Sequence, residues 1–213
     1  MHGLKTHLPL LAAVLSGTVC AVAFVAWGGI NGWQVVGIST YDLFPLFGLL
    51  AFSLLWSLYV AAAAQQYLKA DSPALENYFV VAGYFVLLTI LLHPSLLVFQ
   101  LWRDGFGLPP GSYLENYVAP NLGWAATLGA AAFAAFMAYE LRRLVKSDRW
   151  KTWMVYPSDI AMLAVLIHGL QLGGELQTGW FHTVWWFYGA AYAGCVFYLR
   201  LWPRLQAKLK SSG

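Results

Sequence analysis

The chain contains 213 residues, of which 60% are hydrophobic, 17% are aromatic and only 10% are charged. Soluble domains carry about 25% charged residues, so this composition predicts a protein whose surface faces lipid rather than water. The aromatic content excludes a disordered chain, and the presence of only two cysteines, Cys20 and Cys195, excludes a disulfide scaffold. The net charge of +3 is too small for a nucleic-acid-binding surface, so we expect no nucleic acid as a partner.

Six stretches are apolar over the roughly 20 residues that a membrane-spanning helix needs. We expect helices at about 8–30, 43–68, 74–102, 117–141, 157–176 and 180–202. Pro73 and Pro157 mark two helix starts, and the pairs Gly28-Gly29 and Gly173-Gly174 mark two helix ends. The predicted fold class is therefore an all-α membrane protein, a six-transmembrane-helix bundle that forms a single transmembrane domain over residues 1–213.

The distribution of basic residues predicts the orientation of the bundle in the membrane. Of the 12 Lys and Arg residues, all but Arg103 fall on the side that holds both termini and the loop at 142–151. Basic residues collect on the cytoplasmic side of a membrane. The sequence therefore predicts cytoplasmic N- and C-termini. We expect the basic cluster of this loop to anchor the protein at the membrane interface; the cluster consists of Arg142, Arg143, Lys146, Arg149 and Lys151.

Two histidines lie inside predicted spans, where ionisable residues are functional candidates. At a rise of ~1.5 Å per residue, His93 lies ~14 Å from the outer end of the third span, and His168 lies ~10–12 Å from the outer end of the fifth. Both spans run outward, so the two imidazoles are expected at similar depth. Two imidazoles at one level are what axial ligation of a haem iron requires. We expect His93 and His168 to be the ligands.

Other interpretations of these histidines stay open. A deep histidine can simply hydrogen-bond a carbonyl or hydroxyl of a neighbouring helix. A metal other than haem iron is less favoured, because the spans offer no Cys or carboxylate at that level. His182, near the outer surface, is an alternative ligand. It is better explained as an interfacial histidine among tryptophans, or as a gate or docking group for an outer redox partner.

Two segments resemble a known family. One runs from Gly83 through an apolar stretch to His93-Pro94, and the other leads from Arg149-Trp150 through Tyr156 to His168-Gly169 and Gly173. Their order, spacing and sidedness resemble the ferric-reductase-like transmembrane family, over about residues 43–200. This family includes the membrane domains of ferric reductases and NADPH oxidases, and the haem-binding subunit of methionine-sulfoxide repair systems.

The resemblance implies a haem b protein that passes electrons to an acceptor at the extracytoplasmic face. Two-haem members carry a second pair of histidines one helical stretch nearer the cytoplasm, where this chain has Phe79 and about Val155. The resemblance therefore implies one haem per chain, at the outer site. No flavin or nicotinamide motif is present. We expect a separate electron donor, either a membrane quinol or a flavoprotein.

Two further residues are candidates for contact with the cofactor. Arg103, the sole outer cation, lies ten residues past His93 and is placed to pair with a haem propionate. Ordinary interfacial snorkelling explains it equally well. Gly169 and Gly173 form a small-residue pair directly after His168, which lets either a helix or the edge of the macrocycle approach closely.

Three functional hypotheses follow. The leading one is an electron-transfer haem protein of the inner or plasma membrane, an oxidoreductase if it acts as an enzyme. Its candidate acceptors are ferric iron, oxygen or a periplasmic redox protein. The second is a non-catalytic module that binds haem for transport or sensing, or serves as the partner subunit of a membrane complex. The third is a haem-free structural membrane protein.

Overall fold

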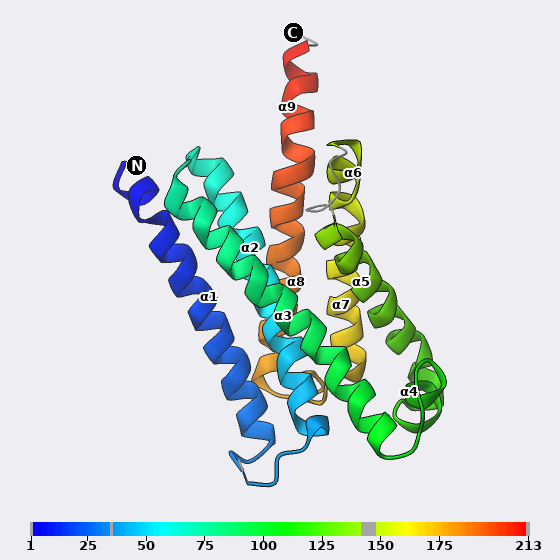
Figure 1. The fold of residues 1–213 in the computed structure, drawn as a ribbon. Coiled ribbons are helices and arrows are strands. Elements are labelled where there is room, and N and C mark those ends of the chain that lie inside the picture. The colour runs from blue at the N-terminus through cyan, green and yellow to red at the C-terminus, as the bar shows by residue number, and fades with distance from the viewer. Residues whose placement is uncertain (1, 35, 142–147, 212–213) are drawn as a thin grey trace. The chain divides into compact units, whose positions relative to one another are not determined.

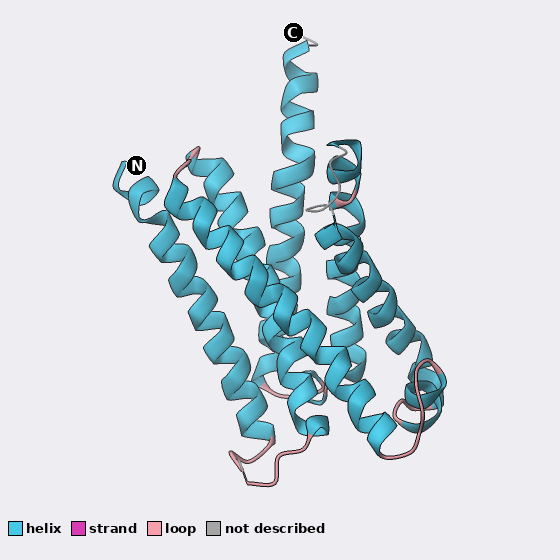
Figure 2. Ribbon diagram, in the orientation of Figure 1, coloured by secondary structure: helices cyan, strands magenta, loops and turns pink. Residues whose placement is uncertain are grey.

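The computed structural model describes residues 2–34, 36–141 and 148–211. Within these ranges every regular element is a helix and no strand occurs (Figures 1 and 2). The long helices are α1 His2–Ile30, α2 Thr40–Leu68, α3 Pro73–Arg103, α5 Gly123–Leu141, α7 Val155–Leu172 and α8 Trp180–Val196. The short elements are α4 Gly111–Asn116, η1 Pro120–Leu122, α6 Asp148–Trp153, η2 Gly174–Leu176, the π-helical η3 Phe197–Leu201 and α9 Trp202–Ser211.

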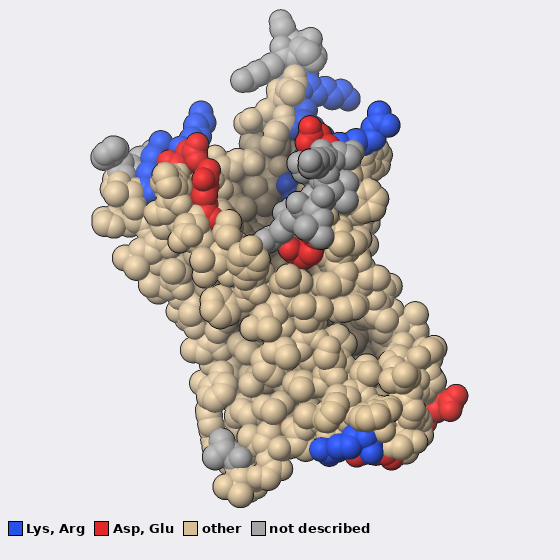
Figure 3. Space-filling model, in the orientation of Figure 1, with Lys and Arg blue, Asp and Glu red and all other residues tan. Residues whose placement is uncertain are grey.

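The described residues contain five helical segments that are long and apolar enough to cross a membrane. They are Gly3–Ile30, Thr40–Leu68, Pro73–Arg103, Pro120–Leu141 and Asp148–Leu172. These segments correspond to the first five predicted spans. On the face drawn in Figure 3, charged side chains gather toward the helix ends, and a wide uncharged surface separates them. The chain is therefore an all-helical, multi-pass membrane protein.

The predicted sixth span, 180–202, has a less regular form. Its α-helical part, α8, has 17 residues, fewer than the roughly 20 that usually cross a bilayer. The backbone continues through the π-helical η3 into α9, so the helical path is unbroken from Trp180 to Ser211.

The fifth helix also differs from its prediction, because it ends at Leu172 and not at residue 176. Gly173 is extended there, with φ −74° and ψ 114°, and a 3-10 turn follows at Gly174–Leu176.

The predicted helix punctuation is visible in the structure. The Leu75 N–H donates to Ser72 Oγ at 3.2 Å, so Ser72 caps α3 and Pro73 occupies the first helical position. At the end of α1, the ring of Trp33 lies so close to Gly28 that an added Cβ would be 2.6 Å from Trp33 Cζ3. Only glycine at position 28 permits this approach.

The chain divides into two compact units. Unit 1 consists of Met1–Trp33, Leu46–Leu91 and Trp186–Gly213, and unit 2 consists of Gln34–Pro45 and Leu92–Trp185. Unit 1 thus takes α1, most of α2, the first part of α3 and the C-terminal helical stretch. Unit 2 takes the remaining parts of α2, α3 and α8 together with all of α4 to α7.

Unit 1 contains a chain of hydroxyl groups that joins three helices. Ser57 Oγ donates to the Leu54 carbonyl at 2.7 Å, and Ser16 Oγ lies 2.8 Å from both Ser57 Oγ and the Tyr78 hydroxyl. Because Ser57 has already used its one proton, Ser16 donates to Ser57 and Tyr78 donates to Ser16. The order of donors is therefore Tyr78, Ser16, Ser57.

The position of Phe79 in unit 1 is filled by apolar packing. Phe79 packs against a buried cluster that contains Leu8, Ala70 and Leu75, and its ring lies 5.3 Å from that of Tyr78, centroid to centroid.

Unit 2 is built around the contact between α5 and α7. Ala125 and Ala132 of α5 are buried, and with Gly129 they form a face of small side chains at helical spacing. Such a face lets a neighbouring helix approach closely. This close approach places His168 of α7 against Gly129 and the Ala125 carbonyl of α5.

Part of the predicted basic anchor lies outside the described residues, namely Arg142, Arg143 and Lys146. Arg149 is exposed on α6. Lys151 belongs to the same short helix.

Candidate functional site

The two histidines predicted from the sequence come together in unit 2. His93 is provided by α3 and His168 by α7, and their ring centroids are 6.3 Å apart with the ring planes at 87°. Both side chains are half-buried. The two histidines that the sequence predicts at similar depth therefore lie beside each other in the structure.

Each imidazole is held by a backbone carbonyl of another helix. His93 Nδ1 lies 2.7 Å from the Phe44 carbonyl oxygen, and His168 Nδ1 lies 2.9 Å from that of Ala125. A carbonyl can only accept a hydrogen bond, so both Nδ1 atoms carry the proton and donate it. In this neutral tautomer Nε2 keeps a free lone pair, which is the form in which histidine binds a metal.

Gly129 makes room for the His168 ring. A Cβ at position 129 would lie 2.5 Å from His168 Nδ1 and 2.6 Å from its Cε1. These distances are far inside van der Waals contact, so any side chain at this position would displace the imidazole. The ring and the Ala125 carbonyl one turn earlier thus use the same small-residue face of α5.

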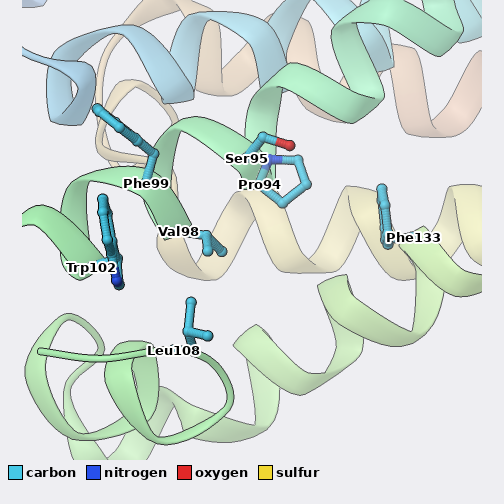
Figure 4. A pocket seen from close by; sticks show the side chains of 7 residues that line it. All are labelled: Pro94, Ser95, Val98, Phe99, Trp102, Leu108 and Phe133. Carbon is cyan, nitrogen blue, oxygen red and sulfur yellow. The ribbon is translucent and has the colours of Figure 1, made fainter.

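An apolar hollow of about 460 Å³ lies in the same unit (Figure 4). Its lining is formed by Pro94, Ser95, Val98, Phe99, Trp102, Leu108 and Phe133. Pro94 directly follows His93, and Phe133 lies one turn past Gly129. The hollow opens to the surface of the unit, and neither His93 nor His168 lines it.

The donor set fits a haem better than a bare metal ion. Among the described residues, no three His, Cys, Asp or Glu side chains are grouped so that they could hold a metal. Two imidazoles leave most coordination positions open, and a porphyrin fills four of them.

Arg103 has a protein partner in the structure. Its Nε lies 3.7 Å from Asp104 Oδ1, and its side chain is 56% exposed. A cation this exposed can swing between Asp104 and another anion at little cost, because surface ion pairs contribute only about 0–1 kcal/mol.

Gly169 faces protein rather than an open space. A Cβ there would lie 3.0 Å from Trp185 Cζ2 and 3.1 Å from Leu176 Cδ1. Trp185 is buried at this contact and donates its indole N–H to the Leu166 carbonyl at 3.3 Å. Of the two roles that the sequence left open for Gly169, the structure shows close packing within the protein.

His182, the alternative ligand, has its Nδ1 2.6 Å from the Leu176 carbonyl, in the turn that joins α7 to α8.

The polar groups around the ends of α2, α3 and α7 have shifted acidities. Hydrogen bonds from the Gln100 amide, at 3.1 and 3.0 Å, are the main cause that lowers the pKa of Asp104. Burial raises the pKa of Glu175. Burial, and then the nearby Glu175 charge, raise the pKa of Tyr117 to about 12.

Sequence reasoning missed three contributors to the site. Phe44 and Ala125 act through backbone carbonyls, which leave no trace in residue identity. Gly129 was detectable in principle, because it stands between Ala125 and Ala132 at the spacing of a small-residue helix face.

No protein-family model matches this chain, and neither a curated protein nor a solved structure matches it.

Proposed function

We propose that the protein binds one haem b between His93 and His168 and transfers electrons to an acceptor at the extracytoplasmic face. The observation that carries this proposal is the paired anchoring of the two Nδ1–H groups on the Phe44 and Ala125 carbonyls, with the rings 6.3 Å apart. The motif resemblance to ferric-reductase-like membrane domains supports the same assignment.

The haem iron, when bound, supplies one-electron chemistry by cycling between its ferric and ferrous states. The residues of this chain hold and orient it. The two carbonyls fix the imidazole tautomers, and Gly129 leaves space for the His168 ring. Arg103, next to the outer end of α3, is proposed to neutralise a propionate. Unchanged haem retention and midpoint potential in Arg103→Ala would remove that role.

The same proposal includes a topology. The helical path from Trp180 to Ser211 forms a sixth crossing, with α8 extended by the π-helical η3. Both termini are cytoplasmic in this topology. The distribution of Lys and Arg in the sequence supports it through the positive-inside rule, because Arg103 alone lies at the opposite side. The membrane is the cell membrane, inner or plasma, and the donor is a separate quinol or flavoprotein.

A second candidate is a protein that binds haem without passing electrons on, either for transport or sensing or as a partner subunit. It uses the same histidine pair and differs only in the absence of a competent acceptor. A haem-free structural protein is the third possibility, in which the carbonyl bonds merely satisfy two buried imidazoles.

Absorption spectra of three purified variants test the site. We expect a low-spin b-type spectrum for the native protein and for His182→Ala, and its loss in His93→Ala and His168→Ala. Thermal unfolding of each variant shows whether the fold is retained. A native protein that binds no haem when haem is supplied would favour the structural alternative, and retention in His168→Ala with loss in His182→Ala would move the ligand to His182.

A redox experiment separates the first two functions. The haem is reduced with dithionite or quinol and then mixed with an outer acceptor. Rapid reoxidation supports electron transfer, and a haem that no acceptor reoxidises would favour the binding or transport role.

A further inference from the structure

A row of aromatic rings leads away from the histidine pair within unit 2. The Phe44 ring lies 5.4 Å from that of His93, and Tyr117 lies 5.6 Å from Phe44, centroid to centroid. Tyr41 stacks on Tyr117 at 5.8 Å with the planes only 11° apart. The rings come from three separate segments, the start of α2, the outer half of α3 and the residue after α4, so their contact is a tertiary feature.

The row runs from the interior of unit 2 to its surface. Phe44 is 8% exposed and Tyr117 is 45% exposed. At the end of the row, the Tyr41 hydroxyl donates to Asp104 Oδ2 at 3.0 Å. Gln100 holds the same carboxylate and also accepts a hydrogen bond from Thr40. The final ring is thus fixed in place at a polar surface.

We propose that Phe44, Tyr117 and Tyr41, which we call the aromatic exit, carry the electron from the histidine-bound iron to a cationic one-electron acceptor that docks beside Tyr41 and Asp104. This inference rests on the proposed function. In the step, the iron is oxidised from ferrous to ferric and the acceptor is reduced by one electron; no bond is broken and no proton moves. Contacting π systems couple donor and acceptor better than saturated side chains of the same length.

The charges at this end favour a cation. The segments around the exit carry three acidic side chains that are not buried, Asp42, Asp104 and Glu115, against the single cation Arg103, which lies 3.7 Å from Asp104. Asp42 is engaged by Ser39, whose backbone N–H and hydroxyl donate to it at 2.8 and 2.7 Å. Asp104 remains ionised, because the Gln100 amide stabilises its charge. Complementary charge raises the rate of encounter and orients the partner.

Stopped-flow oxidation of the reduced protein by hexaammineruthenium(III) tests the path. Phe44→Leu keeps the backbone carbonyl that holds His93, and Tyr117→Leu removes the middle ring. We expect each to slow oxidation by about tenfold, equivalent to about 1.4 kcal/mol of activation free energy. In Tyr117→Leu, whose ring makes no contact with either histidine in the row, the haem spectrum and midpoint potential should not change. A merely structural effect on the site would change them. Tyr117→Phe keeps the ring and should react normally.

Trp180→Leu is the matched control, since Trp180 is an exposed aromatic of the same unit whose ring contacts Phe181 and lies outside the row. Normal rates in Phe44→Leu and Tyr117→Leu would overturn the proposal. A loss in Tyr117→Phe as large as in Tyr117→Leu would also overturn it, because the hydroxyl and not the ring would then be responsible.

A second measurement does not depend on electron transfer. Hexaamminechromium(III) is a paramagnetic trication that is not reduced under these conditions, and it broadens NMR signals near its binding site. In the full-length protein with labelled tyrosines, we expect selective broadening of Tyr41 and Tyr117, weakened by Asp104→Asn. Broadening spread evenly over the tyrosines would overturn the docking surface. This result is obtained whether or not haem is bound, so it fails independently of the proposed function.

Discussion

In unit 1, Tyr78, Ser16 and Ser57 pass hydrogen bonds from one hydroxyl to the next and end on the Leu54 carbonyl. In unit 2, His93 and His168 each donate one hydrogen bond to a carbonyl and keep a free lone pair on Nε2. In the hydroxyl chain, every O–H group donates to the next acceptor, and the three bonds join three helices. Each histidine is oriented by one hydrogen bond and keeps its Nε2 lone pair available, which is what the proposed haem ligation requires.

The two units also differ in the kind of polar group that they bury. Among the described residues, the buried polar side chains of unit 1 are all hydroxyls: Ser16, Ser53, Ser57 and Thr89. Unit 2 buries the hydroxyls of Ser112 and Ser158 and the amide of Gln100, and in addition the carboxyl groups of Asp159 and Glu175. A buried ionisable group is costly unless its environment stabilises the charge or removes it. Unit 2 buries two such groups, and ionisable groups in unfavourable surroundings are common at functional sites.

The largest expected effect is a loss of haem affinity in Gly129→Ala, a substitution that acts on unit 2 alone. The added methyl group would lie 2.5 Å from His168 Nδ1, so the ring must turn away and lose its bond to the Ala125 carbonyl. Loss of an outer-shell partner typically weakens metal binding about 10–100-fold, and we expect haem affinity to fall by that factor. Haem titration followed by absorbance measures it.

Gly194→Ala is the control for this substitution, because a Cβ on Gly194 of α8 meets nothing within 4 Å. It should bind haem normally. If Gly129→Ala also binds haem normally, the small-residue face of α5 does not position His168, and the contrast between the two units is lost.

A smaller effect, confined to unit 1, is expected from Ser57→Ala. This change leaves the buried Ser16 hydroxyl without its acceptor. Hydrogen bonds between membrane helices contribute about 0.6–1.7 kcal/mol, and we expect the free energy of unfolding to fall by this amount. Thermal unfolding followed by tryptophan fluorescence measures the loss, and the haem spectrum should stay unchanged.

Ser53 offers a matched control one turn away on the same helix. Its side chain is fully buried, and its Oγ has no hydrogen-bond partner. Ser53→Ala removes an unpaired polar atom and should be neutral or stabilising. Equal losses in the two alanine variants would show that the hydroxyl chain contributes nothing specific.

The sequence predicted much of this architecture because hydropathy and charge act locally. The first five spans and the proximity of His93 to His168 follow from apolar length and from depth along a helix. Hydropathy did not reveal the π-helical stretch after Val196 or the early end of α7 at Leu172, because both depend on local backbone geometry. Gly173 in particular serves as a helix end only through its extended conformation.

The supporting atoms of the site were less predictable. The Phe44 and Ala125 carbonyls are present in every residue type, so only tertiary structure can select them. Gly169 is a different case. Its residue type predicts a close approach, but the sequence does not show whether a helix or a macrocycle makes that approach. The buried ring of Trp185 settles which neighbour packs against it in the structure.

The smallest expected effect concerns Glu175 and depends on pH. Burial raises the pKa of this carboxyl in the folded state, so the folded protein holds a proton that the unfolded chain releases near pH 4.3. As pH rises from about 4.3 through the raised pKa, the unfolded state is increasingly favoured, and stability is lost. Above the raised pKa the loss is complete and constant.

Glu175→Gln removes this titration. We expect the variant to unfold at a higher temperature than the native protein at pH 8 and at the same temperature near pH 4. Asp104→Asn should behave in the opposite sense, because the pKa of Asp104 is lowered by Gln100. Its carboxylate adds stability above its unfolded pKa of about 3.9, and this stability is lost as pH falls through the lower folded value.

Ser57→Ala in unit 1 should show the same loss of stability at every pH, because it changes no titrating group. A Glu175→Gln difference that also stays constant with pH would mean that the carboxyl does not titrate in this range, and the electrostatic part of the contrast between the units would fail.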